Sequence, residues 1–211
     1  ILLYYVIFHK KILMKEKSNI IALFGASGRT GQAIHAQALT RGIIVRPFNK
    51  KNPSPQDLRK AIKGSYSVII VFGPRAPYTD VFCAETTEKI VTAMKKTGVR
   101  RLICQTGAMI GDYPKNRSFF FELFSGKFRS SNPIGYNDRV QQEKIVASSS
   151  LDWTIVKPPR LTDTTDNTTV QAGVHVKVGL LSSVSRKSLA RFLLDELLTP
   201  HHIRQAVFVK N

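Results

Sequence analysis

Cysteine and acidic residues are scarce in this sequence, and no long apolar run is present. The two cysteines, Cys83 and Cys104, are too few for a disulfide framework, and neither has a neighbouring metal ligand. We therefore expect buried thiols, no metal site and a cytoplasmic location. The apolar residues 1–8 fall far short of the ~20 residues that span a bilayer, and charges follow this stretch instead of preceding it. We expect neither a signal peptide nor stable membrane insertion.

The shortage of acidic residues leaves the chain strongly basic. Lysine and arginine number 32 against 14 aspartates and glutamates, which gives a formal net charge of +18. Such a charge attracts nucleic acid, anionic membranes or anionic small molecules. The basic residues are scattered in short clusters, however, and no nucleic-acid module is recognisable. We interpret them as a solvated surface and expect no nucleic-acid partner, while direct nucleic-acid binding stays open as a third alternative.

The length indicates a single domain. A chain of 211 residues with ordinary apolar and charged fractions can bury one sizeable core. Residues 1–17 are interpreted as an N-terminal extension, non-native or disordered, because Met14 stands just before the first predicted strand and the chain does not begin with methionine. We predict one nucleotide-binding domain over residues 18–211, as a monomer or a homodimer.

A glycine-rich turn is the most informative segment. The apolar run at residues 20–24 leads into three glycines spaced three apart, and a helical pattern over residues 30–41 follows at once. Strand, turn and helix N-terminus together form a site where the backbone can approach a diphosphate and the helix dipole favours its charge. The alternative is a turn that only lets strand and helix pack closely. The predicted diphosphate-binding residues are Gly25, Ser27, Gly28, Thr30 and Gly31.

The second predicted strand, residues 43–49, ends in lysines. An NAD-binding fold usually has Asp or Glu about here to hold the ribose hydroxyls. Lys50 and Lys51, together with Arg29 of the glycine turn, could instead pair with a 2′-phosphate, so we predict NADP(H) in preference to NAD(H). The alternative is that these lysines lie on an exposed loop.

The glycine spacing resembles that of a known family. Gly25-Ala-Ser-Gly-Arg-Thr-Gly31 is similar to the signature of the atypical short-chain dehydrogenase/reductases, which include NmrA-like proteins and biliverdin IXβ (flavin) reductases. Weaker similarity covers residues 67–73, 101–108, 151–159 and 184–198. The resemblance implies an α/β, Rossmann-type, doubly wound and mostly parallel sheet in a three-layer αβα arrangement.

One strand of the family pattern is missing. Residues 52–57 lead directly to the next helical segment, where relatives have a third strand. In the usual order 3-2-1-4-5-6, this loss would place the second strand at the sheet edge, where Pro47 is tolerated because no partner needs its amide.

The resemblance also implies the surroundings of a nicotinamide cofactor. The strand over residues 67–73 should border the cofactor crevice, with Phe72, Gly73 and Pro74 on the adenosine side. The strand over 101–108 should bring Thr106 and Gly107 to the nicotinamide, together with Pro158 after the strand over 151–157. We place Met109, Tyr136 and Arg160 on the substrate side.

The usual proton relay of the superfamily is absent. No tyrosine in the chain has a lysine four residues later, and the position of the usual catalytic serine is Gly107, beside Thr106. We assign catalytic roles to Thr106 and Lys144, the latter because relatives place a lysine near the cofactor there. Lys144 could equally be a solvated helix residue.

Several outer elements complete the prediction. We expect a helix over 79–97, capped by Thr79 or Asp80 with Val81 inward, and another over 136–150. The segment over residues 109–135 is long and rich in aromatic residues, so we expect it to form a lid, an interface or part of the core. A polar loop over 161–173, an outer strand over 174–178, a helix from Ser185 to 198 and a last strand over 206–209 follow.

These features predict an NADPH-dependent reductase of a flavin, quinone or similar conjugated acceptor. Such an acceptor can take hydride directly and its proton from solvent, so no tyrosine acid is required. The alternative is a non-catalytic NADP(H) sensor or scaffold that binds a protein partner, as the resemblance to NmrA-like proteins implies.

Overall fold

The computed structural model describes residues 19–50, 52–79, 81–164 and 169–211. A seven-stranded sheet has the order β2-β1-β3-β4-β5-β9-β7 and is parallel except where β7 pairs with β9. A small sheet pairs β6 with β8. The strands are β1 Ile20–Phe24, β2 Ile44–Phe48, β3 Ser67–Ile70, β4 Arg101–Gln105, β5 Asp152–Lys157, β6 Arg160–Thr162, β7 Gln171–Gly173, β8 Ser183–Ser185 and β9 Gln205–Lys210.

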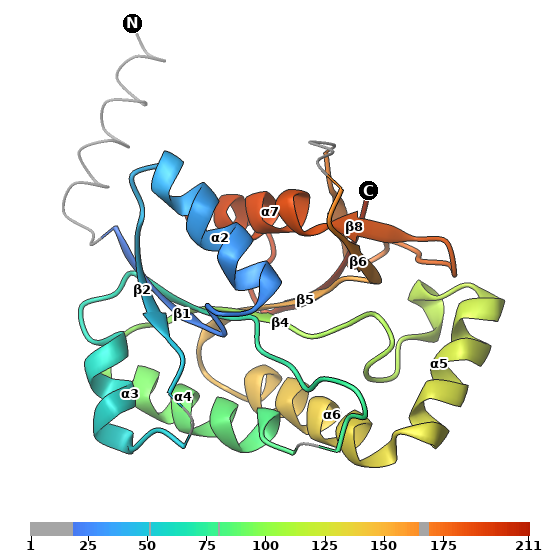
Figure 1. Cartoon of the computed structure of the whole chain (residues 1–211), viewed down its shortest axis with the longest axis horizontal. Coiled ribbons are helices and arrows are strands. Elements are labelled where there is room, and N and C mark those ends of the chain that lie inside the picture. Colours follow the sequence, from blue (N-terminus) through green and yellow to red (C-terminus); the bar gives the residue numbers. More distant parts are fainter. Residues whose placement is uncertain (1–18, 51, 80, 165–168) are drawn as a thin grey trace, which may run out of the picture.

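Helices cover both faces of the sheet, which confirms the predicted three-layer fold (Figure 1). On one face lie α2 (Arg29–Thr40) and α7 (Arg186–Leu198). On the other lie α3 (Pro55–Ile62), α4 (Cys83–Thr97) and α6 (Pro133–Ala147). A short 3-10 helix, η1 (Pro114–Asn116), precedes α5 (Phe119–Ser131), which stands beside the layers and outside them.

Burial of the sheet from both faces explains its apolar strands. Along β1, Ala22 and Phe24 face one apolar core while Ile21 and Leu23 face the other. All four residues of β3 are buried. A parallel strand with helices on both sides must be apolar at almost every position, which is why these strands were recognisable in the sequence.

The predicted loss of the third strand is confirmed. β2 lies at the sheet edge, and within the described residues no strand lies beyond it. Pro47 occupies this edge strand, in register with Leu23 of β1. The chain then enters α3, where the Ser54 hydroxyl accepts from the Asp57 amide and the Asp57 carboxylate accepts from the Ser54 amide.

Two predicted boundaries were wrong. The helix predicted over 79–97 begins at Cys83, Thr79 does not cap it, and Val81 is exposed; Asp80 lies outside the described residues. Instead, the Asp138 carboxylate of α6 accepts from the amides of Cys83 and Ala84, each at 2.9 Å. α6 itself begins earlier than predicted, with a proline in its first turn, where the missing amide costs nothing.

The outer strand predicted over 174–178 was also wrong. The strand in this region is Gln171–Gly173, which pairs with β9. Val178 instead forms backbone hydrogen bonds with Asn116 and Ser118, each at 2.9 Å, so the segment crosses toward α5.

The final strand and the cap of α7 are confirmed, with the Ser185 hydroxyl accepting from the Ser188 amide. Among the described residues, no helix has the length and apolar character needed to cross a membrane.

Candidate functional site

Two of the three glycines in the turn are required by packing. Gly25 has a φ of +90°, and a Cβ on it would lie 2.7 Å from the Phe72 nitrogen. A Cβ on Gly31 would lie 2.3 Å from the Gly25 carbonyl oxygen. Gly28 is different, because the nearest atom to its Cβ would be 3.4 Å away. No contact within the protein demands glycine there, so the open space is suited to a ligand that approaches the backbone.

The start of α2 presents free donors at this turn. Gly28 is the N-cap in an extended conformation, no side chain caps the helix, and its first turn has no acidic residue. The amides and the helix dipole can therefore act on an anion. The Asn49 side chain, from the end of β2, accepts from the Ser27 amide at 3.1 Å and fixes the turn against the sheet edge.

Two cavities lie at the carboxyl ends of the parallel strands, and Phe72 lines both. One has a volume of about 440 Å³ and includes Gly25 and Ser27 of the turn together with Lys50. The other, of about 670 Å³, contains the ends of β4 and β5. An extended molecule with two halves, joined at the glycine turn, fits this arrangement.

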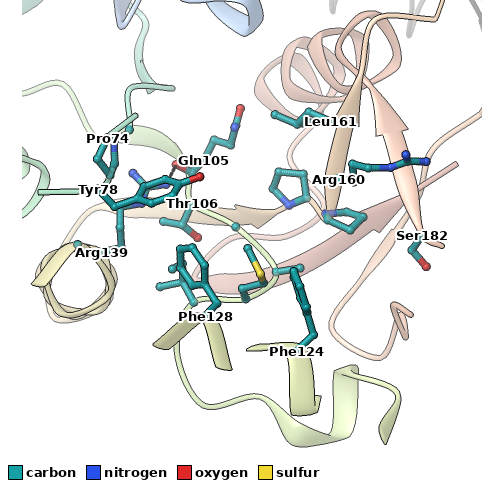
Figure 2. A pocket seen from close by; sticks show the side chains of 18 of the residues that line it. Pro74, Tyr78, Gln105, Thr106, Phe124, Phe128, Arg139, Arg160, Leu161 and Ser182 are labelled. Atoms are coloured by element: carbon teal, nitrogen blue, oxygen red, sulfur yellow. Dashed lines mark hydrogen bonds between the residues drawn. The ribbon is translucent and has the colours of Figure 1, made fainter. Parts of the chain in front are cut away.

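The larger cavity is walled by several separate parts of the chain (Figure 2). Pro74 and Tyr78 stand on one side, and Arg160 and Ser182 on the other. α5 closes it from below with aromatic side chains, and Tyr78 packs edge-on against Phe128 with ring centroids 5.3 Å apart. The wall is mainly apolar, with guanidinium groups from Arg139, Arg160 and Arg186.

Beneath this cavity lies a buried polar cluster that the sequence analysis did not identify. The Thr106 hydroxyl, on the cavity wall, donates to Oε1 of Glu143 at 2.5 Å. The ammonium group of Lys157 pairs with the same oxygen. Tyr113 donates to Oε2 at 3.4 Å, and its ring centroid lies 4.4 Å from the Lys157 nitrogen. Lys157 is fully buried and Glu143 nearly so.

Burial changes the acid–base properties of this cluster. It lowers the pKa of Lys157 to about 8, with the Glu143 carboxylate opposing the shift. It also raises the pKa of Tyr113, and the negative charge of Glu143 adds to that effect. Tyr113 therefore stays a neutral phenol at physiological pH and is no general base.

Arg139 of α6 fixes the strand ends that border the cavity. Its guanidinium donates to the carbonyl oxygens of Phe72, at 2.9 Å, and Gln105, at 3.1 Å, which follow β3 and end β4. It also donates to the Gln142 side chain at 2.7 Å. Four polar residues on α6, spaced i, i+1, i+4 and i+5, thus face inward. They are Asp138, Arg139, Gln142 and Glu143.

Of the residues predicted for the 2′-phosphate, Lys51 lies outside the described residues, and Lys50 and Arg29 are not equivalent. Lys50 lines the smaller cavity and pairs with Asp57 at 2.6 Å, and this pairing lowers the pKa of the Asp57 carboxyl. Arg29 lines neither cavity. It pairs at 2.8 Å with Asp163, which also binds Arg186 at 2.6 Å. Arg29 thus joins the glycine turn to the segment after β6, whereas Lys50 lies at the smaller cavity.

Other predicted site residues also differ in whether they line a cavity, and in which one. Thr106, Gly107, Met109, Pro158 and Arg160 all line the larger cavity. Gly73 and Pro74 also line it, rather than the smaller cavity beside Lys50, where the adenosine side was expected.

Tyr136 and Lys144 line neither cavity. The Tyr136 hydroxyl donates to the Gly111 carbonyl at 3.3 Å. Lys144 is exposed, while its neighbour Glu143 faces inward, because consecutive residues of a helix point in directions about 100° apart. The ammonium group beside Thr106 is that of Lys157.

Comparison with known proteins identifies the family to which this chain belongs. The model of a family described as NAD(P)H-binding matches residues 45–200, which is more than half of the chain. The chain therefore belongs to this NAD(P)H-binding family. The open space at Gly28 and the uncapped helix amides fit the diphosphate of such a cofactor.

Solved structures share the fold at low sequence identity. A short-chain dehydrogenase/reductase from Veillonella parvula, in complex with NADP, is 18% identical with a TM-score of 0.73, covering 91% of this chain and 94% of that one. The oxidoreductase YlbE from Lactococcus lactis is 16% identical, with a TM-score of 0.70 and coverages of 91% and 90%. ChuY from Escherichia coli O157:H7, an anaerobillin reductase, is 16% identical, with a TM-score of 0.69 and coverages of 90% and 96%.

Proposed function

We propose that this protein is an NADPH-dependent reductase that transfers hydride to a flavin, a quinone or a similar conjugated acceptor. The observation that carries the proposal is the pair of cavities that meet at Phe72 beside the glycine turn. The smaller cavity, with Lys50, suits the adenosine half and its 2′-phosphate. The larger, mainly apolar cavity suits the nicotinamide and a flat acceptor.

The bound nicotinamide cofactor would supply the hydride, and the residues of the larger cavity would bind and orient the acceptor. No lysine lines this cavity, and Tyr78 is the one tyrosine among its described lining residues. The Thr106 proton is directed at Glu143, which leaves the hydroxyl oxygen to accept a hydrogen bond from a ligand or water. An acceptor protonated by solvent suits such a site.

The cationic groups of the cavity favour an anionic acceptor. Arg160 is exposed at its wall, and Arg186 contributes a guanidinium there that is held by Asp163. A phosphate- or carboxylate-bearing acceptor would be bound by these groups with charge-assisted hydrogen bonds. The likeness to an anaerobillin reductase supports a reductase in this fold.

The test is a titration of the purified protein with NADPH and NADH, followed by absorbance of the reduced nicotinamide after addition of FMN or a quinone. Tight NADPH binding and oxidation above the protein-free rate are expected. Binding without oxidation of any acceptor would favour the second candidate, a non-catalytic NADP(H) sensor. The absence of the tyrosine–lysine pair is also consistent with that candidate. Absence of binding would contradict both.

A further inference from the structure

The outer side of α5 carries an unusual set of exposed apolar side chains. Its aromatic and leucine residues at positions i, i+1, i+4 and i+5 are 51% to 72% exposed, and two neighbouring leucines before β8 are 52% and 91% exposed. Exposed apolar residues that gather in one place mark an interaction surface, whereas single ones do not. We call this set the α5 face: Phe119, Phe120, Leu123, Phe124, Leu180 and Leu181.

α5 is held in place by its other side. Phe121 packs in an apolar cluster with Val178 and Phe208, and the Ser125 hydroxyl donates to the Met109 carbonyl at 2.9 Å. The loop that carries the two leucines is joined to the start of the helix, because the Ser118 amide donates to the Val178 carbonyl at 2.9 Å. The α5 face is thus formed by a helix that is held by its other side and by the loop joined to it, and the helix stands outside the layers of the fold (Figure 1).

Charge decides which partner fits this face. Lys127 is exposed on the same side of the helix, and Lys115 is exposed just before it. The one acidic residue of α5, Glu122, is paired with Arg117 at 2.9 Å. Since the chain carries a formal net charge of +18, two copies would repel each other at close approach, whereas a negatively charged surface would attract the protein.

We propose that the α5 face docks the protein on the surface of an anionic lipid bilayer. Phenylalanine and leucine side chains would enter the boundary between head groups and acyl chains, and the nearby Lys115 and Lys127 would contact the phosphates. Phe124 and Leu180 also line the larger cavity, so its mouth would open toward the lipid. The proposal concerns the surface of the protein and does not depend on its being a reductase.

The test is co-sedimentation of the full chain with vesicles of phosphatidylglycerol and phosphatidylcholine. Phe120→Ser/Leu123→Ser removes two side chains of the α5 face that do not line the cavity. The matched control is Leu39→Ser/Ile44→Ser, which removes two exposed apolar side chains of α2 and β2. Residues 1–18 are the same in all three proteins, so any contribution of that segment is common to them.

The wild type and the control are expected to bind vesicles containing phosphatidylglycerol, while the α5 variant binds about tenfold or more weakly. Binding should fall with added salt and with vesicles of phosphatidylcholine alone. Equal binding by the α5 variant and the control would overturn the proposal, as would no binding by the wild type. Light scattering that shows a wild-type dimer and a monomeric α5 variant, without vesicle binding, would assign the face to a second copy of the chain and also overturn it.

Discussion

Lys157 and Glu143 form a buried ion pair directly beneath the Thr106 hydroxyl of the larger cavity. Lys157 ends β5 and Glu143 lies on α6, so the pair joins the sheet to the helix that covers it. Two charges taken out of water are costly unless each has a partner. Here the carboxylate also accepts from Thr106 and Tyr113, which satisfies both of its oxygens.

Breaking this pair on one side should destabilise the fold strongly. Glu143→Gln leaves the Lys157 ammonium buried without a counter-charge, so we expect the free energy of unfolding to fall by about 3–5 kcal/mol. Lys157→Met/Glu143→Gln removes both charges and should recover much of that loss. Urea unfolding followed by circular dichroism measures both. A loss below about 1 kcal/mol in Glu143→Gln would contradict the buried pair.

The same lysine should make stability depend on pH in the alkaline range. Its pKa is about 8 in the folded protein against 10.5 for an ordinary lysine. Between these values the unfolded chain binds more protons than the folded one, so the cost of burying the charged lysine disappears as pH rises. The free energy of unfolding of the wild type, relative to Lys157→Met, should therefore increase from pH 8 to pH 10.

Lys144→Met provides the control for this pH effect. Lys144 is the exposed lysine next to Glu143, so its removal should leave the pH dependence of the wild type unchanged. The buried lysine is flanked by the guanidinium groups of Arg117 and Arg139, which also depress its pKa. If the difference in the free energy of unfolding between the wild type and Lys157→Met stayed constant from pH 8 to pH 10, the Lys157 ammonium would not be desolvated.

The layers and the sheet order could be predicted because each depends on local pattern. Strands such as β3 are apolar throughout because they are buried on both faces. The prolines of β2 and of the following segment indicated an edge strand without a further neighbour. The glycine turn is recognisable because Gly25 and Gly31 have no room for a side chain.

The buried polar residues could not be predicted in the same way. A lysine at the end of a strand is ordinarily solvated, and nothing next to Lys157 in the sequence reveals that Glu143 faces it. The cap of α4 comes from Asp138, more than fifty residues away along the chain. The spacing of Asp138, Arg139, Gln142 and Glu143 on one helical side was the available signal, but it identifies a polar side and not the element that covers it.

The glycines of the turn should respond differently to alanine. Gly31→Ala places a methyl group 2.3 Å from the Gly25 carbonyl oxygen, so we expect a loss of about 1–3 kcal/mol in the free energy of unfolding. Gly28→Ala has room within the protein and should change stability by less than about 0.5 kcal/mol. It should still weaken NADPH binding about tenfold, because the methyl group would occupy the space left for the diphosphate. Equal effects of the two variants on stability would contradict this division of roles.

Lys50 should distinguish NADPH from NADH. It is the one lysine among the described residues that line the smaller cavity, and its partner Asp57 is held by Ser54 at the start of α3, so the ammonium is already positioned when a ligand arrives. Lys50→Ala should weaken NADPH binding about tenfold or more and NADH binding less than about twofold, because only NADPH carries the 2′-phosphate.

Lys60→Ala, which removes an exposed lysine on the same helix that contains Asp57, controls for the change in net charge. Isothermal titration with both cofactors at one salt concentration gives the comparison. Equal losses for the two cofactors in Lys50→Ala, or an equal loss of NADPH affinity in Lys60→Ala, would show that the basic surface acts only through its overall charge.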